Sequence, residues 1–448
     1  MLKSKLLSFT VLFALLVAGW FSVHYSFPRY GMQYIVMAIL LLSDLYLWTA
    51  VKKSIFHYGR FWNGLITFVF WLPMISVLTM IAVSFFIPLN KWSPVITTYL
   101  TGFILVFYTA KIFPLIFLTV ADLLRVFEKM LHLFKRSKRI EIRKGGEEGI
   151  TRGKFLEYMA YLSGGLVFGT MLTGMFKWVY QFNLVKQKIV SKRLPGSFQG
   201  MRIVQISDMH LGSWKSKKPL EEAVAVINGL SADLVLFTGD LVNFSTKEAF
   251  RFEDTLKKIK AKHGVYATLG NHDYGEYVSW PSHEAKRKNM QQLYAFYRRI
   301  GWKLMNNTHE LIFRGKEKIA LVGVENWGSH KRFPKYGDIE KAVKGIEKGV
   351  FKILMTHDPT HWDEVIVPGK YDIDISLSGH THGFQFGIET KSLKWSPAQY
   401  VYKHWAGLYK DAGSGNMLYV NRGIGSIGYP GRIGILPEIT LFELLKEG

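Results

Sequence analysis

Long runs of apolar residues crowd the first 180 positions of the chain, whereas later positions alternate between short apolar and polar stretches. Five runs are long enough for a helix that crosses a bilayer: residues 6–23, 32–51, 62–89, 95–120 and 158–176. Lys3 and Lys5 precede the first run, as in a secretory signal, but no small-x-small cleavage site follows it, which favours an anchor. The pattern therefore predicts a transmembrane region of about five helices over residues 1–180.

Two of these runs contain a charged residue, Asp44 in the second and Lys111 in the fourth. A charge at the centre of a bilayer costs about 3 kcal/mol unless it is paired or solvated. Two interpretations stay open for these residues. Either Asp44 and Lys111 pair between helices, or both lie near a membrane interface.

Basic residues are concentrated in alternate loops between the apolar runs. The loop after the fourth run holds ten lysines and arginines between Arg125 and Lys154, whereas the loops on the other side hold only Arg29 and Lys91. Basic loops remain in the cytoplasm. With five crossings, everything after the fifth run is expected on the extracytoplasmic side of the membrane.

The second half of the chain repeats a pattern of short β-rich run, polar turn and amphipathic helix. Residues 181–200, which contain Pro195, Gly196 and Gly200, are interpreted as a linker, and residues 201–448 as one domain. The predicted strands are residues 202–207, 234–238, 264–269, 317–324, 351–356 and 373–377, and the first two predicted helices are 218–230 and 247–262. Strands that alternate with helices predict an α/β domain.

Almost every predicted strand ends in an acid, an asparagine or a histidine. In α/β sheets, ligands bind beyond the carboxyl ends of the strands, so we expect these residues to form one site. The candidates are Asp208, His210, Asp240, Asn271, His272, His357, His380 and His382. They are too many for one tetrahedral zinc ion and suit two divalent ions that share a carboxylate. Nitrogen and oxygen ligands without sulfur favour Mn, Fe or Zn.

The order of the motifs resembles the calcineurin-like metallophosphoesterase superfamily. The chain has D-x-H at 208–210, G-D at 239–240, G-N-H-D at 270–273, a histidine at 357 and G-H-x-H at 379–382. The resemblance covers residues 201–445, and the segment 419–441 is similar to the membrane-linked bacterial, phosphodiesterase-like branch. It implies a central β-sandwich flanked by helices.

The same resemblance implies a role for each motif residue. Asp208, His210 and His382 would bind the first metal. Asn271, His357 and His380 would bind the second, and Asp240 would bridge the two. His272 would protonate the leaving oxygen or contact the phosphate, while a metal-activated hydroxide attacks phosphorus.

Two positions depart from the family pattern. Asn243 stands where phosphatase members carry an acid that orients the proton-donating histidine, and Phe384 stands where close relatives have glycine. Phe384 would narrow the site or offer an apolar surface to a lipid or ring. Arg422 and Arg432, in the glycine-rich tail, either bind the substrate phosphate or cap a strand.

Charge and cysteine content limit the possible functions. The net charge is +23, from 57 basic and 34 acidic residues, and there is no cysteine. The densest basic block lies between two membrane helices, where topology and anionic lipid headgroups account for it. Membrane lipids and a phosphoester are therefore expected as partners, and nucleic acid is not. The absence of cysteine excludes thiolate metal sites and disulfides.

The favoured hypothesis is a membrane-anchored phosphoesterase with two metals that hydrolyses a phosphodiester or phosphomonoester, such as a lipid or envelope intermediate. A nuclease is the first alternative, for which residues 286–299 would supply a basic, aromatic helix. A receptor or transport module with a vestigial phosphoesterase domain is the second. The third turns the same enzyme domain inward, as for a nucleotide-sugar pyrophosphatase of lipid assembly.

Overall fold

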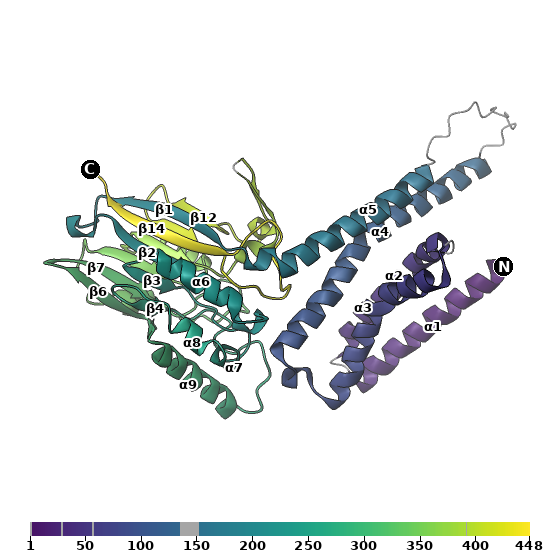
Figure 1. Cartoon of the computed structure of the whole chain (residues 1–448), viewed down its shortest axis with the longest axis horizontal. Coiled ribbons are helices and arrows are strands. Elements are labelled where there is room, and N and C mark those ends of the chain that lie inside the picture. Colours follow the sequence, from purple (N-terminus) through teal and green to yellow (C-terminus); the bar gives the residue numbers. More distant parts are fainter. Residues whose placement is uncertain (1, 28–29, 56–57, 135–151, 391) are drawn as a thin grey trace. The chain divides into compact units, whose positions relative to one another are not determined.

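Helices make up the first part of the chain and two β-sheets dominate the last part (Figure 1). The computed structural model describes residues 2–27, 30–55, 58–134, 152–390 and 392–448, so most of the predicted basic loop lies outside the described residues. Two compact units are present. One contains Met1–Pro88 and Phe103–Gly169, and the other contains Leu89–Gly102 and Thr170–Gly448.

Each predicted apolar run coincides with one long helix, although the third run, 62–89, extends three residues past the end of its helix. The helices are α1 (Leu2–Ser26), α2 (Gly31–Ile55), α3 (Arg60–Phe86), α4 (Pro94–Phe134) and α5 (Arg152–Phe176). Among the described residues, four helices are long and apolar enough to cross a membrane, and they correspond to α2, α3, α4 and α5. The predicted count of five is therefore corrected to four. The first run is also helical, as α1, but α1 is not among these four.

Asp44 and Lys111 form a buried ion pair within the helical unit. Lys111 Nζ lies 2.7 Å from Asp44 Oδ1 and also donates to the carbonyl of Phe70 at 2.9 Å. The Tyr108 hydroxyl donates to the other oxygen of Asp44 at 2.9 Å. This confirms pairing between helices, because the contacts join α2, α3 and α4.

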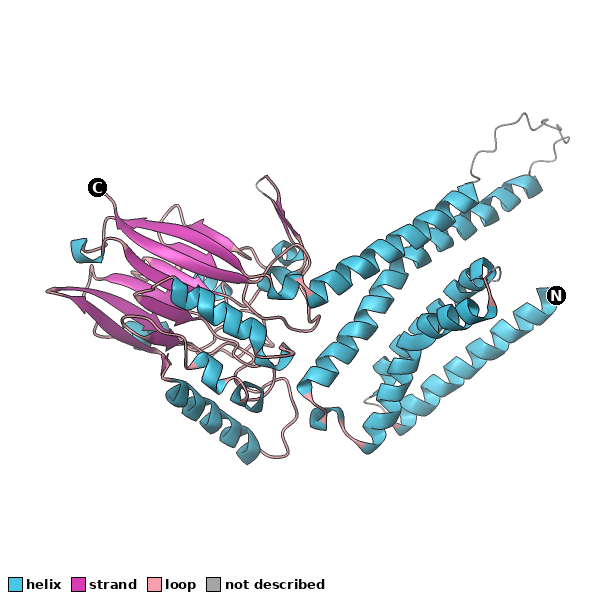
Figure 2. Ribbon diagram, in the orientation of Figure 1, coloured by secondary structure: helices cyan, strands magenta, loops and turns pink. Residues whose placement is uncertain are grey.

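The β-rich part is a sandwich of two six-stranded sheets (Figure 2). The first sheet has the order β1-β14-β2-β3-β4-β5 and the second has the order β12-β13-β9-β8-β7-β6. The strands of the first sheet are β1 (Asn183–Ser191), β14 (Glu438–Lys446), β2 (Met201–Ile206), β3 (Leu234–Phe237), β4 (Val265–Ala267) and β5 (Lys303–Leu304). Those of the second are β12 (Gly407–Lys410), β13 (Met417–Val420), β9 (Ile375–Ser378), β8 (Phe351–Met355), β7 (Glu317–Gly323) and β6 (Thr308–Arg314).

The core lies between the sheets, and helices cover their outer faces. Ile203 and Leu236 of the first sheet pack with Ile353 and Leu377 of the second in one buried cluster. The first sheet is covered by α6 (Lys218–Gly229), α8 (Glu253–Leu256) and α9 (His283–Ile300), and the second by α10 (Ile339–Val343). This confirms the predicted α/β class and the sandwich flanked by helices.

Parallel pairing brings the ends of several strands together. In the first sheet β2, β3 and β4 run parallel, with Ile206 beside Phe237 and Phe237 beside Ala267. In the second sheet β7, β8 and β9 also run parallel. The carboxyl ends of these strands therefore lie at common edges, where the loops that follow them meet.

Two sequence assignments need correction. The predicted linker, residues 181–200, contains β1, which pairs along Asn183–Ser191 with β14. Lys186 and Lys188 hide its β pattern, because an edge strand tolerates lysine on its open side. The single helix predicted over residues 247–262 is two short helices, α7 (Lys247–Phe250) and α8. The domain boundaries themselves stay a prediction.

Candidate metal centre

All eight predicted site residues lie in loops that follow strands of the two sheets. Asp208 and His210 follow β2, Asp240 follows β3, and Asn271 and His272 follow β4. His357 follows β8, and His380 and His382 follow β9. As expected, these residues follow the carboxyl ends of strands, and they come from both sheets of the sandwich.

Many of these side chains depend on an uncommon backbone conformation. Asp208, His210, Asp240, His380 and His382 all have positive φ, between 46° and 72°. This left-handed region costs a residue with a side chain on the order of 1–3 kcal/mol, and such residues cluster at functional sites. The fold holds five of the seven predicted metal ligands in this state.

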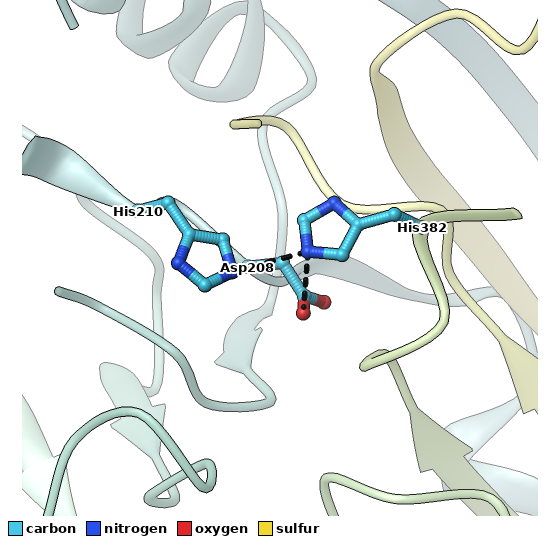
Figure 3. Close-up of side chains that lie close together, drawn as sticks. All are labelled: Asp208, His210 and His382. Atoms are coloured by element: carbon cyan, nitrogen blue, oxygen red, sulfur yellow. Dashed lines mark hydrogen bonds and ion pairs between the residues drawn. The ribbon is translucent and has the colours of Figure 1, made fainter. Parts of the chain in front are cut away.

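Asp208, His210 and His382 form the first group (Figure 3). His382 Nε2 lies 3.2 Å from Asp208 Oδ1 and 3.1 Å from His210 Nε2. All three side chains are buried. The rings and the carboxylate therefore point their ligand atoms at one small volume, although they come from segments 172 residues apart.

Asp240, His357 and His380 form the second group. His357 Nε2 lies 3.2 Å from Asp240 Oδ2 and 3.3 Å from His380 Nδ1. Asp240 also joins the two groups, because its Oδ2 lies 3.5 Å from His210 Nε2. One carboxylate oxygen thus faces imidazoles of both groups.

Hydrogen bonds select the ring nitrogens that remain available. His357 Nδ1 faces the Thr238 carbonyl at 2.7 Å, so its Nε2 is directed toward Asp240. His380 Nε2 lies 2.9 Å from the Tyr402 hydroxyl and 3.5 Å from Asp358 Oδ2, so its Nδ1 is directed toward His357. Partners of this kind fix the orientation of metal-binding histidines.

Electrostatics favour the protonation states that bind cations. Burial would raise the pKa of the Asp208 and Asp240 carboxyls, yet the neighbouring histidines, His382 and His357, hold both below their ordinary values. Burial lowers the pKa of His210, His380 and His382, which leaves those rings neutral. Metal ligation requires ionised carboxylates and neutral imidazoles.

Asn271 provides a test of whether a cation fits. His357 is the exception to the pattern above, because Asp240 raises its pKa to about 10 despite burial, and its ring must lose a proton before it can bind a metal. The Asn271 side chain donates from Nδ2 to the Tyr277 hydroxyl at 2.8 Å, while its Oδ1 is buried without a hydrogen-bond partner. A buried amide oxygen without a donor is costly unless a cation faces it. The residues therefore fit two divalent ions.

His272 lies beside the two groups and belongs to neither. Its Nδ1 is 2.7 Å from the backbone oxygen of Asn243, and its backbone N–H donates to Asp240 Oδ1 at 2.9 Å. The side chain of Asn243 turns away and donates to Ser213. The backbone carbonyl of Asn243, and not its side chain, therefore faces His272.

Three supporting residues were missed from the sequence. Asp273 is buried and accepts hydrogen bonds from four backbone N–H groups, at Asp240, Leu241, Val242 and Gly270, which fixes the loop of the bridging aspartate. The position of Asp273 in the motif G-N-H-D could have identified it from the sequence. Asp358 and Tyr402 both lie beside Nε2 of His380. Asp358 could have been noticed because it directly follows His357, whereas nothing in the sequence around Tyr402 indicates its contact with His380.

Arg422 and Arg432, predicted to bind the substrate phosphate or to cap a strand, both contact other groups of the protein. Arg422 is buried and forms ion pairs with Glu438 and Glu389. Arg432 is fully buried, and its guanidinium donates to the carbonyls of Arg422, Gly423 and Gly425. The guanidinium also lies 3.2 Å from Nδ1 of His382. Arg432 therefore contacts a predicted ligand, and phosphate binding by either arginine stays a prediction.

The basic helix that motivated the nuclease alternative is largely neutralised. In α9, Lys286 pairs with Glu276 and Arg287 pairs with Glu284. Arg299, at the end of the helix, pairs with Glu253. Side chains in ion pairs make a poor path for a nucleic-acid backbone, whose affinity depends on free cations.

Comparison with known families agrees with this geometry. Residues 201–384 match the calcineurin-like phosphoesterase model, and residues 29–178 match the model of a probable calcineurin-like phosphoesterase transmembrane domain. The chain belongs to the calcineurin-like metallophosphoesterases. The second match also agrees with the membrane helices, since it covers α2 to α5.

Several curated proteins resemble this metallophosphoesterase over about two thirds of its length. A transmembrane protein with metallophosphoesterase domain from Danio rerio is 28% identical over 66% of the chain, which spans 64% of that relative. The metallophosphoesterase YkuE of Bacillus subtilis is 28% identical over 66% of the chain and 98% of its own length. The UDP-2,3-diacylglucosamine pyrophosphatase LpxG of Chlamydia muridarum is 28% identical over 63% of the chain and 96% of its own length.

Proposed function

We propose that the protein is a membrane-anchored phosphoesterase with two divalent metal ions, which hydrolyses a phosphodiester or phosphomonoester of a lipid or envelope intermediate. The observation that carries the proposal is the position of Asp240, whose Oδ2 faces His210 of one ligand group and His357 of the other. A shared carboxylate is typical of two-metal phosphoryl transfer sites.

The proposed ligands follow from the two groups. Asp208, His210 and His382 would hold one ion, and Asn271, His357 and His380 would hold the other, with Asp240 between them. When bound, the two ions would lower the pKa of water and neutralise charge on the phosphoryl group. Mn, Fe and Zn all suit this donor set.

His272 is the proposed proton donor. An alkoxide leaving group needs a proton, and imidazole titrates in the right range to supply it. With Nδ1 held by the Asn243 carbonyl at 2.7 Å, the other ring nitrogen is the one that can face substrate. His272 therefore has a fixed orientation without serving as a metal ligand.

The proposed substrate class rests on the membrane region and on one relative. LpxG is named as a pyrophosphatase of a diacylated nucleotide sugar, a molecule that joins acyl chains to a phosphoester linkage. A phosphoesterase attached to membrane helices meets molecules of this kind at the bilayer. We propose a lipid-linked phosphoester for this chain, with the catalytic domain on the extracytoplasmic side.

Hydrolysis of bis(4-nitrophenyl) phosphate by the full-length protein with Mn²⁺ tests the proposed chemistry. Asp240→Asn should bind less metal and lose hydrolysis by at least about 10²-fold, because removal of one electrostatic stabiliser commonly costs that much. Metal content and rate are measured on the same preparation. Asp254→Asn, an exposed aspartate of α8, is the matched control and should retain both. Full activity in Asp240→Asn would end the proposal.

A further inference from the structure

Exposed apolar side chains gather in the segment that follows the last predicted metal ligand. Between residues 384 and 401 they are Phe384, Phe386, Ile388, Leu393, Tyr400 and Val401, which we call the apolar rim. Ile388 and Leu393 are 49% and 50% exposed and lie on or beside the hairpin of β10 (Ile388–Glu389) and β11 (Lys394–Trp395). The mechanism proposed above involves none of these side chains.

The apolar rim is tied by backbone hydrogen bonds to a loop that contacts membrane helix α5. Gly387 donates to the Ile433 carbonyl at 2.9 Å, and Ile433 donates to the Gln385 carbonyl at 2.8 Å. In the same loop, the backbone N–H of Arg432 donates to the Gly174 carbonyl of α5 at 3.2 Å. The segment that contains Arg432 and Ile433 is therefore the only backbone between the rim and α5 in this chain of hydrogen bonds.

The contacts on α5 lie within its predicted membrane span. That span covers Lys154–Tyr180 and ends in Trp178 and Tyr180, residue types that mark the bilayer interface. Tyr99, near the start of α4, places its hydroxyl 2.9 Å from that of Tyr180. Gly174 lies two residues before the end of α5 at Phe176 and four residues before Trp178, so the loop contact lies close to the expected interface.

The rim also leads toward the metal centre. The ring of Phe384 stands edge-on to that of Tyr402 with centroids 6.2 Å apart. The Tyr402 hydroxyl lies 2.9 Å from Nε2 of His380. Contacts through Tyr402 thus lead from Phe384 of the exposed rim to a predicted ligand, His380.

We propose that the apolar rim is inserted in the interface of the bilayer that α5 crosses, so that the metal centre receives a lipid-linked phosphoester directly from the membrane. The part about substrate rests on the proposed function, whereas the part about membrane contact does not. Exposed apolar side chains gathered in one segment mark interaction with a membrane or partner, and the backbone link from this segment to a spanning helix favours the membrane.

Lipid quenching tests the membrane contact. The chain has no native cysteine, so Ile388→Cys and Leu393→Cys can each carry a single environment-sensitive fluorophore in the full-length protein. In phosphatidylcholine vesicles with bromine on the acyl chains, both positions should be quenched. Phe313→Cys is the matched control, because Phe313 is 57% exposed on β6 and outside the rim. Equal quenching at all three positions, or a disulfide between two copies at Leu393→Cys without quenching, would overturn the proposal.

The double variant Ile388→Gln/Leu393→Gln distinguishes membrane contact from delivery of the substrate. Dodecyl 4-nitrophenyl phosphate in vesicles should be cleaved at least about tenfold more slowly by this variant, because the loss of two aliphatic side chains inserted in the bilayer costs more than 1.4 kcal/mol. Bis(4-nitrophenyl) phosphate in water should be cleaved at the wild-type rate. An equal loss on both substrates would overturn delivery from the membrane. Quenching without any hydrolysis by the wild type would leave the membrane contact standing and remove the proposed function.

Discussion

Single residues in the site depend on the backbone as much as on side chains. His272 is oriented by the carbonyl of Asn243, and four backbone N–H groups converge on Asp273. Asn243 stands where phosphatase members carry an acid, and its backbone carbonyl faces Nδ1 of His272. A carbonyl oxygen of any residue type can accept this hydrogen bond, but it supplies no charge. The role of His272 as proton donor stays a proposal.

Asn243→Ala should therefore leave hydrolysis nearly unchanged, because alanine retains the carbonyl that faces Nδ1 of His272. His272→Gln should lower kcat by about 10²–10⁴-fold if the imidazole supplies the proton. Initial rates with bis(4-nitrophenyl) phosphate compare the two variants. A large loss in Asn243→Ala at unchanged metal content would show that its side chain, and not its backbone, orients His272.

Arg432 illustrates a residue that acts on the site through a neighbour. Arg432→Lys cannot reproduce the bonds to several carbonyls and to His382, because lysine carries a single donor centre. We expect metal affinity in the first group to fall by about 10–100-fold, as for other residues behind a ligand. Titration of the metal-free protein with Mn²⁺ measures this, with the exposed Arg298→Lys as control. Unchanged affinity for both ions would refute the positioning role.

At the level of elements, close packing explains which glycines of α5 matter. The spacing Gly165-x-x-x-Gly169 resembles a helix-contact motif, yet a Cβ at Gly165 would meet nothing within 4 Å. At Gly174 a Cβ would lie 2.6 Å from the Arg432 carbonyl oxygen. The contact between α5 and the loop of Arg432 thus requires glycine at 174, for a partner 258 residues away in the chain.

Gly174→Ala should destabilise the protein by about 1–3 kcal/mol, the usual cost of overpacking. Gly165→Ala, in the same helix, should be neutral. Thermal unfolding of the full-length protein in detergent, followed by tryptophan fluorescence, compares the two. If both variants unfold at the same temperature, the contact between α5 and the loop contributes nothing to stability.

For the whole molecule, the proposed topology rests on the basic residues and one helix. By the distribution of basic residues, the sequence between α4 and α5 is expected in the cytoplasm, and α5 would then cross once before the catalytic domain begins. The corrected count of four spans leaves this expectation unchanged, because it depends only on α5. The inward-facing pyrophosphatase alternative requires the opposite orientation.

A reporter fused after Gly448 distinguishes the two orientations. Alkaline phosphatase, which folds only outside the cytoplasm, should be active there, whereas green fluorescent protein should stay dark. The same pair of reporters fused at residue 140, within the basic loop, should give the reverse pattern. Fluorescence at the C-terminus would place the catalytic domain in the cytoplasm and favour the nucleotide-sugar pyrophosphatase.

The sequence by itself determined the class of fold and the set of candidate ligands. The period of the hydrophobic pattern distinguishes a membrane helix, an amphipathic helix and a strand. Candidate metal ligands can be recognised because only a few residue types, such as the aspartate at 240 and the histidine at 357, can bind a metal, and they occur in short motifs. Both signals are local along the chain. Strand β1 escaped detection because exposed lysines on an edge strand interrupt the apolar pattern.

Only the tertiary structure decided how these residues work together. The grouping around Asp240, the roles of Arg432 and Tyr402, and the link from the apolar rim to α5 all join segments far apart in the sequence. Their geometry depends on sheet pairing and on left-handed backbone at the strand ends. Contacts of about 3 Å between such segments cannot be read from the periodicity of the sequence, because they are set by tertiary packing and not by local propensity.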